Sequence, residues 1–400
     1  MDTVLPDPMA MLFSPGGADD PHHAYRELRD QCPVARNEFA GTPSVSLSRY
    51  EDVLWAMRHP EVFSSDAEAM VLGEQPLIPL QVDPPQHTRY RRLLNPEFLP
   101  RTVARIEPDV RVLVGQLVDA FADRGHCDFH EEFATPLPST IFLRLMGLPQ
   151  RDLATFLQWR DDTVRPDVEP GDFEAAARVR AETSRAINAY FEDALEDRRR
   201  RPDDGLLSQL ATAEVDGVRL SQRELLGICH LMLIGGLDTV TATLDCIIVY
   251  LARHPDRRRA IVADPSLLPS AIEELLRRET PVMVVPRIVK QDVTLRGVEL
   301  HTGDRVTLLL GAANTDDAEF TDAEGVEFAR DPNKHVAFGG GHHLCLGAHL
   351  ARLELRVGLE EFHRRIPDYR IAEGSEIHFS PGIRQADRLP LLFAPAGEQT

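Results

Sequence analysis

Residues 338–347 read Phe338-Gly-Gly-Gly-His-His-Leu-Cys345-Leu-Gly347, and this stretch decides the fold. Glycines allow a backbone to approach a flat or bulky group closely. Backbone N–H groups at the start of a helix lower the pKa of a nearby thiol. Taken alone, the stretch is also compatible with a buried cysteine or with a turn that merely requires glycine. The complete spacing Phe-x-x-Gly-x-His-x-Cys-x-Gly has very little chance of arising by accident, and it favours a functional cysteine.

A second unusual stretch lies inside a long helical pattern that runs from Ser221 to Arg253. A helix of this length spans about 50 Å. Its middle reads Gly235-Gly-Leu-Asp-Thr239, in which each glycine costs about 1 kcal/mol relative to alanine. A buried aspartate there also needs a partner. The pattern predicts either a tight helix crossing with a satisfied aspartate, or a locally opened helix that exposes a carboxylate and a hydroxyl to a cavity.

The charge balance excludes nucleic acid as a partner. The chain carries 44 Lys and Arg against 64 Asp and Glu, which gives a formal net charge of −20. Binding to phosphates requires a dense cationic face. The 400 residues, 43% of them hydrophobic, are enough for a large core,. Length alone suggests two or three domains at roughly 150 residues each, but no linker or repeat divides the chain, and we expect a single domain over residues 1–400.

Cysteine usage and the N-terminus predict a cytoplasmic protein. The cysteines are odd in number and scattered, which favours a reducing compartment. The N-terminal residues lack the basic and apolar regions of a signal peptide,. The longest apolar stretches, 231–237 and 246–252, are shorter than the ~20 residues of a membrane span. We therefore expect no membrane anchor.

Helical periodicity dominates the chain. The expected helices cover 21–31, 48–58, 87–95, 103–124, 138–147, 171–200, 221–253, 255–264, 268–279 and 346–365. Alternation typical of strands is confined to 45–47, 288–300, 305–310 and 369–394. The sequence therefore predicts a mainly α fold with a minor β portion.

The motifs, in their order along the chain, resemble those of the cytochrome P450 family, and the resemblance covers nearly the whole sequence. It is closest to the soluble bacterial type, and the wording Gly-Gly-Leu-Asp-Thr-Val is closest to the camphor-hydroxylase branch. The stretch at Cys345 is similar to the haem-binding signature of the family. The other matching segments are His87-Thr-Arg-Tyr-Arg91, Gly235 to Thr239, Glu274-Leu-Leu-Arg277 and the meander-like Phe328-Ala-Arg330 with Asp331-Pro332.

The resemblance implies a triangular prism in which haem b lies between the long central helix and the helix that follows the cysteine. Cys345 is then the thiolate ligand of the iron, a ligand that favours cleavage of the O–O bond. Phe338 and Gly347 belong to the same cofactor site. Cationic and donor side chains that would bind the haem propionates are His87, Arg91, Arg287, His335 and His343. Glu274, Arg277 and Arg330 are expected to form a structural ion network that positions the cysteine loop.

Asp238 and Thr239 are the expected catalytic pair. Splitting dioxygen requires protons inside a dry pocket, and a carboxylate with a neighbouring hydroxyl can deliver them. Gly235 and Gly236 are expected to leave room for dioxygen beside the helix. These residues predict a monooxygenase. A peroxide-driven peroxygenase and a non-catalytic haem-binding or lipid-binding protein remain as alternatives at this point.

The expected substrate pocket is apolar. The resemblance to the P450 family implies that it is lined by Leu231, Ile234, Gly235, Val282, Met283, Val285 and Ile383, with further contacts from the loop at 67–80, including Met70 and Val71. Such a lining fits a terpenoid, a steroid or an alkylaromatic better than a fatty acid held by its carboxylate.

The chain has no flavin or nicotinamide motif, so electrons are expected from a ferredoxin and its reductase. A basic face formed by Arg91, Arg92, Arg101, Arg105, His342 and Arg352 would steer that partner,. The protein is expected to be a monomer. One departure from the family pattern stands at Thr315 and Asp317, which replace the usual Arg and Pro and remove a cation near the meander.

Overall fold

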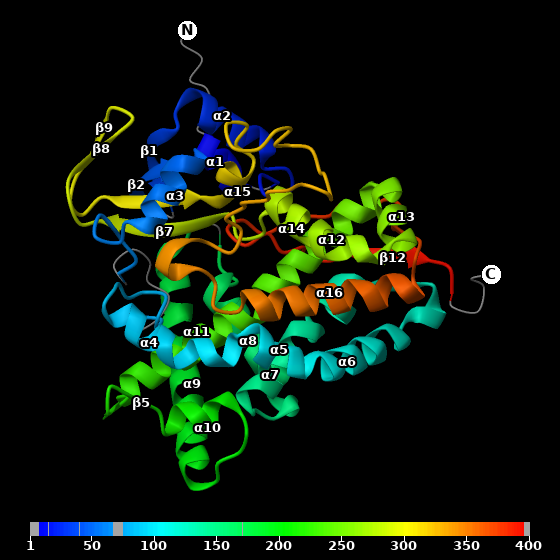
Figure 1. Ribbon diagram of the computed structural model, residues 1–400, viewed down its shortest axis with the longest axis horizontal. Helices are drawn as coiled ribbons and strands as arrows, with labels where there is room; N and C mark the ends of the chain where they lie inside the picture. Colours follow the sequence, from blue (N-terminus) through cyan, green and yellow to red (C-terminus); the bar gives the residue numbers. More distant parts are fainter. Residues whose placement is uncertain (1–7, 15, 40, 67–74, 170, 396–400) are drawn as a thin grey trace.

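The computed structural model describes residues 8–14, 16–39, 41–66, 75–169 and 171–395 (Figure 1). Its α-helices are α1 (Pro8–Phe13), α2 (His22–Gln31), α3 (Tyr50–Arg58), α4 (Gln86–Leu94), α5 (Pro100–Val103), α6 (Glu107–Asp119), α7 (Pro136–Met146), α8 (Leu153–Val164), α9 (Phe173–Arg200), α10 (Leu206–Ala211), α11 (Gln222–Leu237), α12 (Thr239–Arg253), α13 (Pro255–Ala263), α14 (Leu268–Glu279), α15 (Leu310–Asn314) and α16 (Ala348–Arg365). A π-helical turn, η5 (His130–Ala134), precedes α7.

The largest sheet has the strand order β1-β2-β10-β7-β3. Its strands are β1 (Val34–Phe39), β2 (Thr42–Leu47), β10 (Arg305–Leu309), β7 (Val284–Val289) and β3 (Phe63–Ser64), and only the β2–β10 pair is parallel. A smaller sheet joins β11 (Tyr369–Ile371), β12 (Pro390–Phe393) and β4 (His126–Asp128). Two hairpins complete the strands, β5 (Glu214–Val215) with β6 (Val218–Arg219) and β8 (Val293–Leu295) with β9 (Val298–Leu300). The predicted class, mainly α with a minor β portion, is confirmed.

Some helices lie beside the main sheet, and others lie at the opposite end of the molecule. In Figure 1 the sheet lies at the upper left with α2 and α3, whereas α9 and α10 lie at the bottom. The orange helix α16 runs between these regions and packs against α6, α12 and α14. The loop before α16 contacts α3 and α4, so the cysteine loop is held from several sides.

The predicted helix 221–253 is interrupted at Asp238, which separates α11 from α12. Ser221 and Glu224 form the expected capping box at its start. Near the interruption, the Thr239 hydroxyl donates to the Gly235 carbonyl at 3.1 Å. Such back-bonding to the preceding turn bends helices. Of the two alternatives that the glycines predicted, the structure therefore shows the locally opened helix.

The α11–α12 pair is the central element of the core. A window within Gln222–Arg253 is long and apolar enough to cross a membrane, but 83% of that window is buried inside the structure. A helix that is apolar on all sides and surrounded by protein is typical of the centre of a large core. Burial by protein accounts for its composition.

Two further elements differ from the expectation. Helix α8 was not predicted, although Leu153, Phe156 and Trp159 recur at a spacing of three, because the run of charged residues from Arg160 to Asp162 cuts the apolar pattern short. The predicted helix 103–124 is divided into α5, α6 and short 3₁₀ turns, and Pro108 lies in the first turn of α6. Proline is accepted there because the first turn lacks an intrahelical N–H partner.

A buried ion network ties α14 to the segment before the cysteine loop. Arg277 donates twice to Glu274 at 2.8 Å, and the side chains of both residues are fully buried. Arg330 also donates to Glu274 at 3.0 Å. The remaining Arg277 donors reach the carbonyls of Asn314, Ala323 and Gly325 at 2.6–2.8 Å. The structure thus brings together the three residues expected to form this network.

Replacing Arg277 with methionine is expected to lower the free energy of unfolding by about 3–5 kcal/mol. The change leaves a buried carboxylate and several carbonyls without their main donor. Chemical unfolding of the full-length protein measures the loss. The neighbouring Arg278→Gln, which removes one contact to the Glu324 carbonyl, is the matched control and should cost about 1 kcal/mol or less. Equal losses in the two variants would contradict a special role for the buried network.

The departure at Thr315 and Asp317 is compensated from elsewhere in the chain. Arg29 on α2 is buried and donates to the Thr315 hydroxyl at 2.9 Å and to the Ala312 carbonyl at 3.0 Å. Arg49 pairs with the buried Asp316 at 2.8 Å and with Asp317 at 3.4 Å. The expectation that a cation is lost here was wrong, because Arg29 supplies it.

Candidate functional site

The cysteine loop is a tight turn pressed against α3. Gly339 and Gly341 have φ values of +74° and +62°, a region that favours glycine. A Cβ atom at Gly341 would lie 2.2 Å from the Met57 carbonyl oxygen. The Cys345 N–H donates to the Phe338 carbonyl at 2.9 Å and closes the turn. Cys345 therefore lies at a fixed position just before α16.

The surroundings of the Cys345 thiol combine opposing effects on its pKa. Burial raises the pKa of Cys345, whereas a hydrogen bond from the Gly347 backbone N–H and the charges of Arg91 and Arg352 lower it. A cavity of about 310 Å³ is lined by Cys345, Phe338, Arg91 and Arg352, among others. The net effect, in which burial is the largest cause, raises the pKa of the Cys345 thiol, so the Gly347 N–H and the two arginines offset only part of the cost of a buried thiolate,.

The carboxylate of Glu273 on α14 supports the cysteine loop. Glu273 accepts two bonds from Arg352, both 2.7 Å long, and its Oε2 lies 3.1 Å from His335 Nε2. The Arg352 guanidinium lies over the Phe338 ring, 4.4 Å from its centroid. These contacts hold the pKa of Glu273 at about 2, against the effect of its own burial.

His335 contacts protein groups with both of its ring nitrogens. Its Nε2 faces Glu273, and its Nδ1 accepts from the Ala337 N–H at 3.2 Å. These contacts support the cysteine loop, and the expected contact of His335 with a haem propionate stays a prediction.

Three other expected propionate ligands form a cluster of donors. His87 is buried, and both of its ring nitrogens lack a partner among the described residues. The ring centroids of His87 and His343 are 4.4 Å apart, and the buried Nε2 of His343 has no partner in the described part of the chain either. Arg287 on β7 is 6% exposed and donates only to the adjacent Pro286 carbonyl in this part of the structure.

The pKa values in this cluster show the cost of its burial. Burial lowers the pKa of His87 to about 4, of His343 to about 3 and of Arg287 to about 10. A buried guanidinium without a counter-charge is strongly unfavourable. The cluster therefore matches a ligand that brings carboxylates, because charge-assisted bonds to an anion would offset this cost. The two propionates of haem meet that requirement.

Arg91 is bound to the cysteine loop itself. It donates to the Leu344 carbonyl at 2.7 Å and to the Asn95 side chain at 2.9 Å. Arg91 thus links α4 to the residue directly before Cys345. Gly347, the last glycine of the motif, has no atom within 4 Å of an added Cβ.

The two glycines of the central helix have different surroundings. An added Cβ at Gly235 would meet no atom within 4 Å, whereas one at Gly236 would lie 2.8 Å from the Phe142 ring on α7. Gly235 therefore borders open space, and Gly236 permits a tight helix crossing. The expectation that both glycines leave room beside the helix holds for Gly235 and is wrong for Gly236.

Asp238 is fully buried and forms an ion pair that the sequence did not reveal. Arg165, just after α8, donates to the two carboxylate oxygens of Asp238 at 2.7 and 3.0 Å. Arg160 lies 3.8 Å from the same carboxylate. The expectation that the opened helix exposes this carboxylate to a cavity was wrong, because the local turn aims it at Arg165. The adjacent Thr239 is only partly buried.

Most residues expected to line the substrate pocket lie at the edge of the hydrophobic core. Leu231, Val282, Val285 and Ile383 are partly buried, and Ile234 is 9% exposed beside the open space at Gly235. Val282 and Ile383 pair with one another in an isolated bridge. Met283 is an exception, because it is fully buried in the hydrophobic core and is corrected to a core residue. The expected contacts at Met70 and Val71 lie outside the described residues.

Comparison with known proteins agrees with this arrangement. A family profile described as Cytochrome P450 matches residues 6–365. This chain is a cytochrome P450. The steroid C26-monooxygenase of Mycolicibacterium smegmatis is 36% identical to this P450 over 390 residues, covering 96% of this chain and 95% of the relative.

Two further relatives extend the comparison. The methyl-branched lipid omega-hydroxylase of Mycobacterium bovis is 34% identical over 392 residues, which cover 93% of this P450 and 90% of the relative. The crystal structure of CYP109E1 from Bacillus megaterium in complex with testosterone has a TM-score of 0.87 and 30% identity, and covers 94% of this chain and 98% of that one. This P450 is accordingly a monooxygenase with haem b as cofactor.

Proposed function

We propose that this P450 hydroxylates a steroid or a methyl-branched lipid. The observation that carries this proposal is the partly buried apolar lining next to Gly235 and Thr239. Leu231, Ile234, Val282, Val285 and Ile383 supply only apolar side chains to the described part of this lining. Relatives named for a steroid and for a branched lipid support this class over a compact terpenoid or an alkylaromatic.

We infer that Cys345 binds the haem iron and that His87, His343 and Arg287 bind the propionates. The unpartnered buried donors of these side chains support the assignment. Haem with a thiolate ligand supplies the activation of dioxygen with two electrons. Arg91 and the Glu273–Arg352 pair hold the loop that carries Cys345. The Phe338 ring in this loop contacts the Arg352 guanidinium, and Gly347 leaves space at the start of α16.

Proton delivery is assigned to Asp238 and Thr239. The Thr239 hydroxyl faces the side of Gly235 and already donates to its carbonyl. Asp238 directly precedes Thr239 in the chain and is paired with Arg165, in the segment that follows α8. A side-chain rotation of Asp238 away from Arg165 would carry a proton from that segment towards Thr239.

The electron donor is proposed to be a ferredoxin that docks beside Cys345. Arg92, Arg101, Arg105 and His342 are exposed, and Arg91 and Arg352 line the cavity that contains Cys345. Cations on an acidic protein would steer an acidic partner. Part of this charge is already neutralised, because Arg92 pairs with Asp216 and Arg352 with Glu273. We also propose that the chain is a single, monomeric, cytoplasmic haem-binding unit.

The shift of ferric haem from low to high spin tests the proposed substrate class. Cholest-4-en-3-one is expected to produce this shift at micromolar concentration, because the apolar lining excludes water from the iron when it is filled. Camphor and a linear fatty acid serve as comparison compounds. Turnover with ferredoxin, its reductase and a nicotinamide electron source should exceed turnover with hydrogen peroxide alone. Comparable rates would favour a peroxygenase, and the absence of turnover with both would favour a binding protein.

A further inference from the structure

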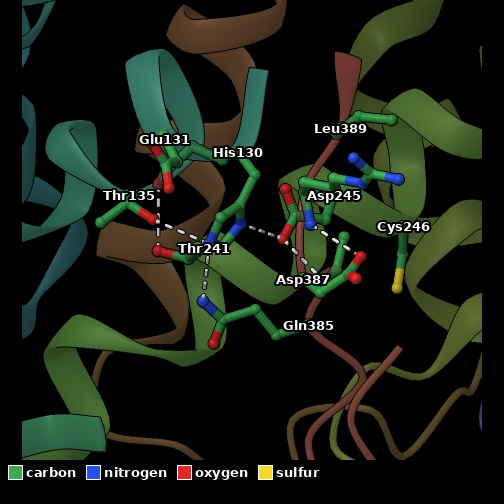
Figure 2. A network of polar contacts seen from close by, with 12 residues as sticks. His130, Glu131, Thr135, Thr241, Asp245, Cys246, Gln385, Asp387 and Leu389 are labelled. Atoms are coloured by element: carbon green, nitrogen blue, oxygen red, sulfur yellow. Dashed lines mark hydrogen bonds and ion pairs between the residues drawn. The ribbon is translucent and has the colours of Figure 1, made fainter. Parts of the chain in front are cut away.

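A buried histidine–aspartate pair, His130 and Asp245, lies beside Gln385 (Figure 2). His130 belongs to the π-helical turn η5 and is 9% exposed, whereas Asp245 on α12 is fully buried. Their Nδ1 and Oδ2 atoms are 2.8 Å apart. Because a carboxylate only accepts hydrogen bonds, the Nδ1 of His130 carries the proton of this bond.

The pair reaches the segment 380–386 through direct contacts. The Ala386 N–H donates to Asp245 Oδ2 at 3.2 Å. Gln385 Nε2 lies 3.3 Å from His130 Nε2, and Thr135 Oγ1 lies 3.4 Å from the same nitrogen. Figure 2 shows His130 between Thr135 and Gln385 on one side and Asp245 on the other. The histidine and the aspartate thus hold adjacent residues at the base of the turn.

Hydrogen bonds within residues 380–385 make the turn stiff, so a displacement at Gln385 also moves Ile383. The Ser380 hydroxyl and the Gln385 N–H both donate to the Ile383 carbonyl, at 2.7 and 2.9 Å. The Met283 N–H donates to the Gly382 carbonyl at 2.9 Å, next to the bridge between Val282 and Ile383. The base of the turn is therefore connected to two residues of the apolar lining.

The surroundings shift the pKa of both members of the pair. Burial lowers the pKa of His130, but the hydrogen bond and the charge of Asp245 outweigh it and raise the pKa overall. Arg160 on α8 lowers this pKa and Asp128 on β4 raises it. Burial also raises the pKa of Asp245, against the bond from His130. The hydrogen bond between His130 and Asp245 therefore offsets part of the cost of burying each side chain in the core.

We propose that His130 and Asp245 are positioning residues that set the location of the 381–383 turn against the substrate and thereby select the carbon that is oxidised. This inference rests on the proposed function only in so far as Ile383 borders the substrate. A displacement of about 1 Å in a positioning group changes reaction geometry strongly. Neither residue is expected to touch haem or substrate.

The test compares His130→Ala, which removes both contacts, with His130→Asn, which keeps a donor near the position of Nδ1. We expect hydrogen exchange of the 380–386 segment in the haem-loaded enzyme to accelerate about tenfold in His130→Ala and less in His130→Asn. With cholest-4-en-3-one as the substrate, the ratio of hydroxylated products should change by roughly threefold or more in His130→Ala and by less in His130→Asn. Asp245→Asn, which keeps the volume of the side chain, should change both readouts in the same direction.

The matched control is His363→Ala on α16. His363 is also buried, and its ring contacts Tyr369 and the Leu359 carbonyl instead of the turn. This control should leave exchange at 380–386 and the product ratio unchanged. Equal shifts in His363→Ala and His130→Ala, or no shift in either readout for His130→Ala and Asp245→Asn, would overturn the inference.

The two proposals can fail separately. The thiolate-type spectrum and the turnover of the unmodified enzyme test the proposed function. Exchange at 380–386 tests the positioning of the turn even where cholest-4-en-3-one is not converted. A double variant of His130→Ala with Asp245→Asn should resemble His130→Ala alone, because the pair acts as one unit. Additive effects in the double variant would contradict the coupling.

Discussion

Replacing Cys345 with alanine is expected to remove the thiolate-type absorption of the reduced, carbon monoxide-bound enzyme and to abolish turnover. The loop that carries Cys345 is closed by the bond to the Phe338 carbonyl and by the close approach to Met57, so no other sulfur can take its place. The remaining cysteines in the described part of the chain lie on other elements, and Cys127, Cys229 and Cys246 are buried there.

The spectrum provides a direct measurement of this effect. Cys345→His should bind haem with an imidazole ligand and give a different band. The control variant Cys229→Ala removes a buried thiol on α11 and should leave the band unchanged. Retention of the thiolate-type band in Cys345→Ala would show that the iron ligand has been assigned incorrectly.

The second large effect is expected at the interruption of the central helix. Asp238→Asn should lower turnover about 100-fold, because an amide cannot take up and release a proton in this step. Substrate binding, measured by the spin shift, should change little, since Asp238 is fully buried and faces Arg165.

Thr239→Ala should act differently from Asp238→Asn. Electron consumption is expected to continue while product falls and hydrogen peroxide is released, because the hydroxyl next to Gly235 is lost. Thr243→Val removes the hydroxyl one turn further along α12, where it donates to the Thr239 carbonyl, and serves as the control. The measured quantity is the ratio of product to nicotinamide consumed, and an unchanged ratio in Thr239→Ala would contradict its role in proton delivery.

Local motifs allowed much of the site to be predicted from the sequence. Glu274 and Arg277 are three residues apart on one helix, and the glycines around Cys345 define a turn within ten residues. Such spacings translate directly into geometry, because helix and turn periods are known. The helical class followed from the same periodicity.

Contacts between distant segments could not be predicted in this way. Asp238 and Arg165 are 73 residues apart, and His130 and Asp245 are separated by 115 residues. Which arginine reaches a buried aspartate depends on the path of α8 across α11, and no local pattern encodes that path. The contact between His335 and Glu273 on α14 is a further example, because these residues are 62 positions apart in the chain.

The bond from Arg29 to Thr315 limits how this enzyme can be recombined with its relatives. A chimaera that imports residues 310–330 from a relative with arginine at position 315 would place two guanidinium groups in one buried space. The reverse exchange, which imports α2 without Arg29, would leave the Ala312 carbonyl without that donor. The two segments therefore form one exchangeable unit, although nearly three hundred residues separate them in the chain. Crossover points for directed recombination should keep α2 and the 310–317 segment from the same parent.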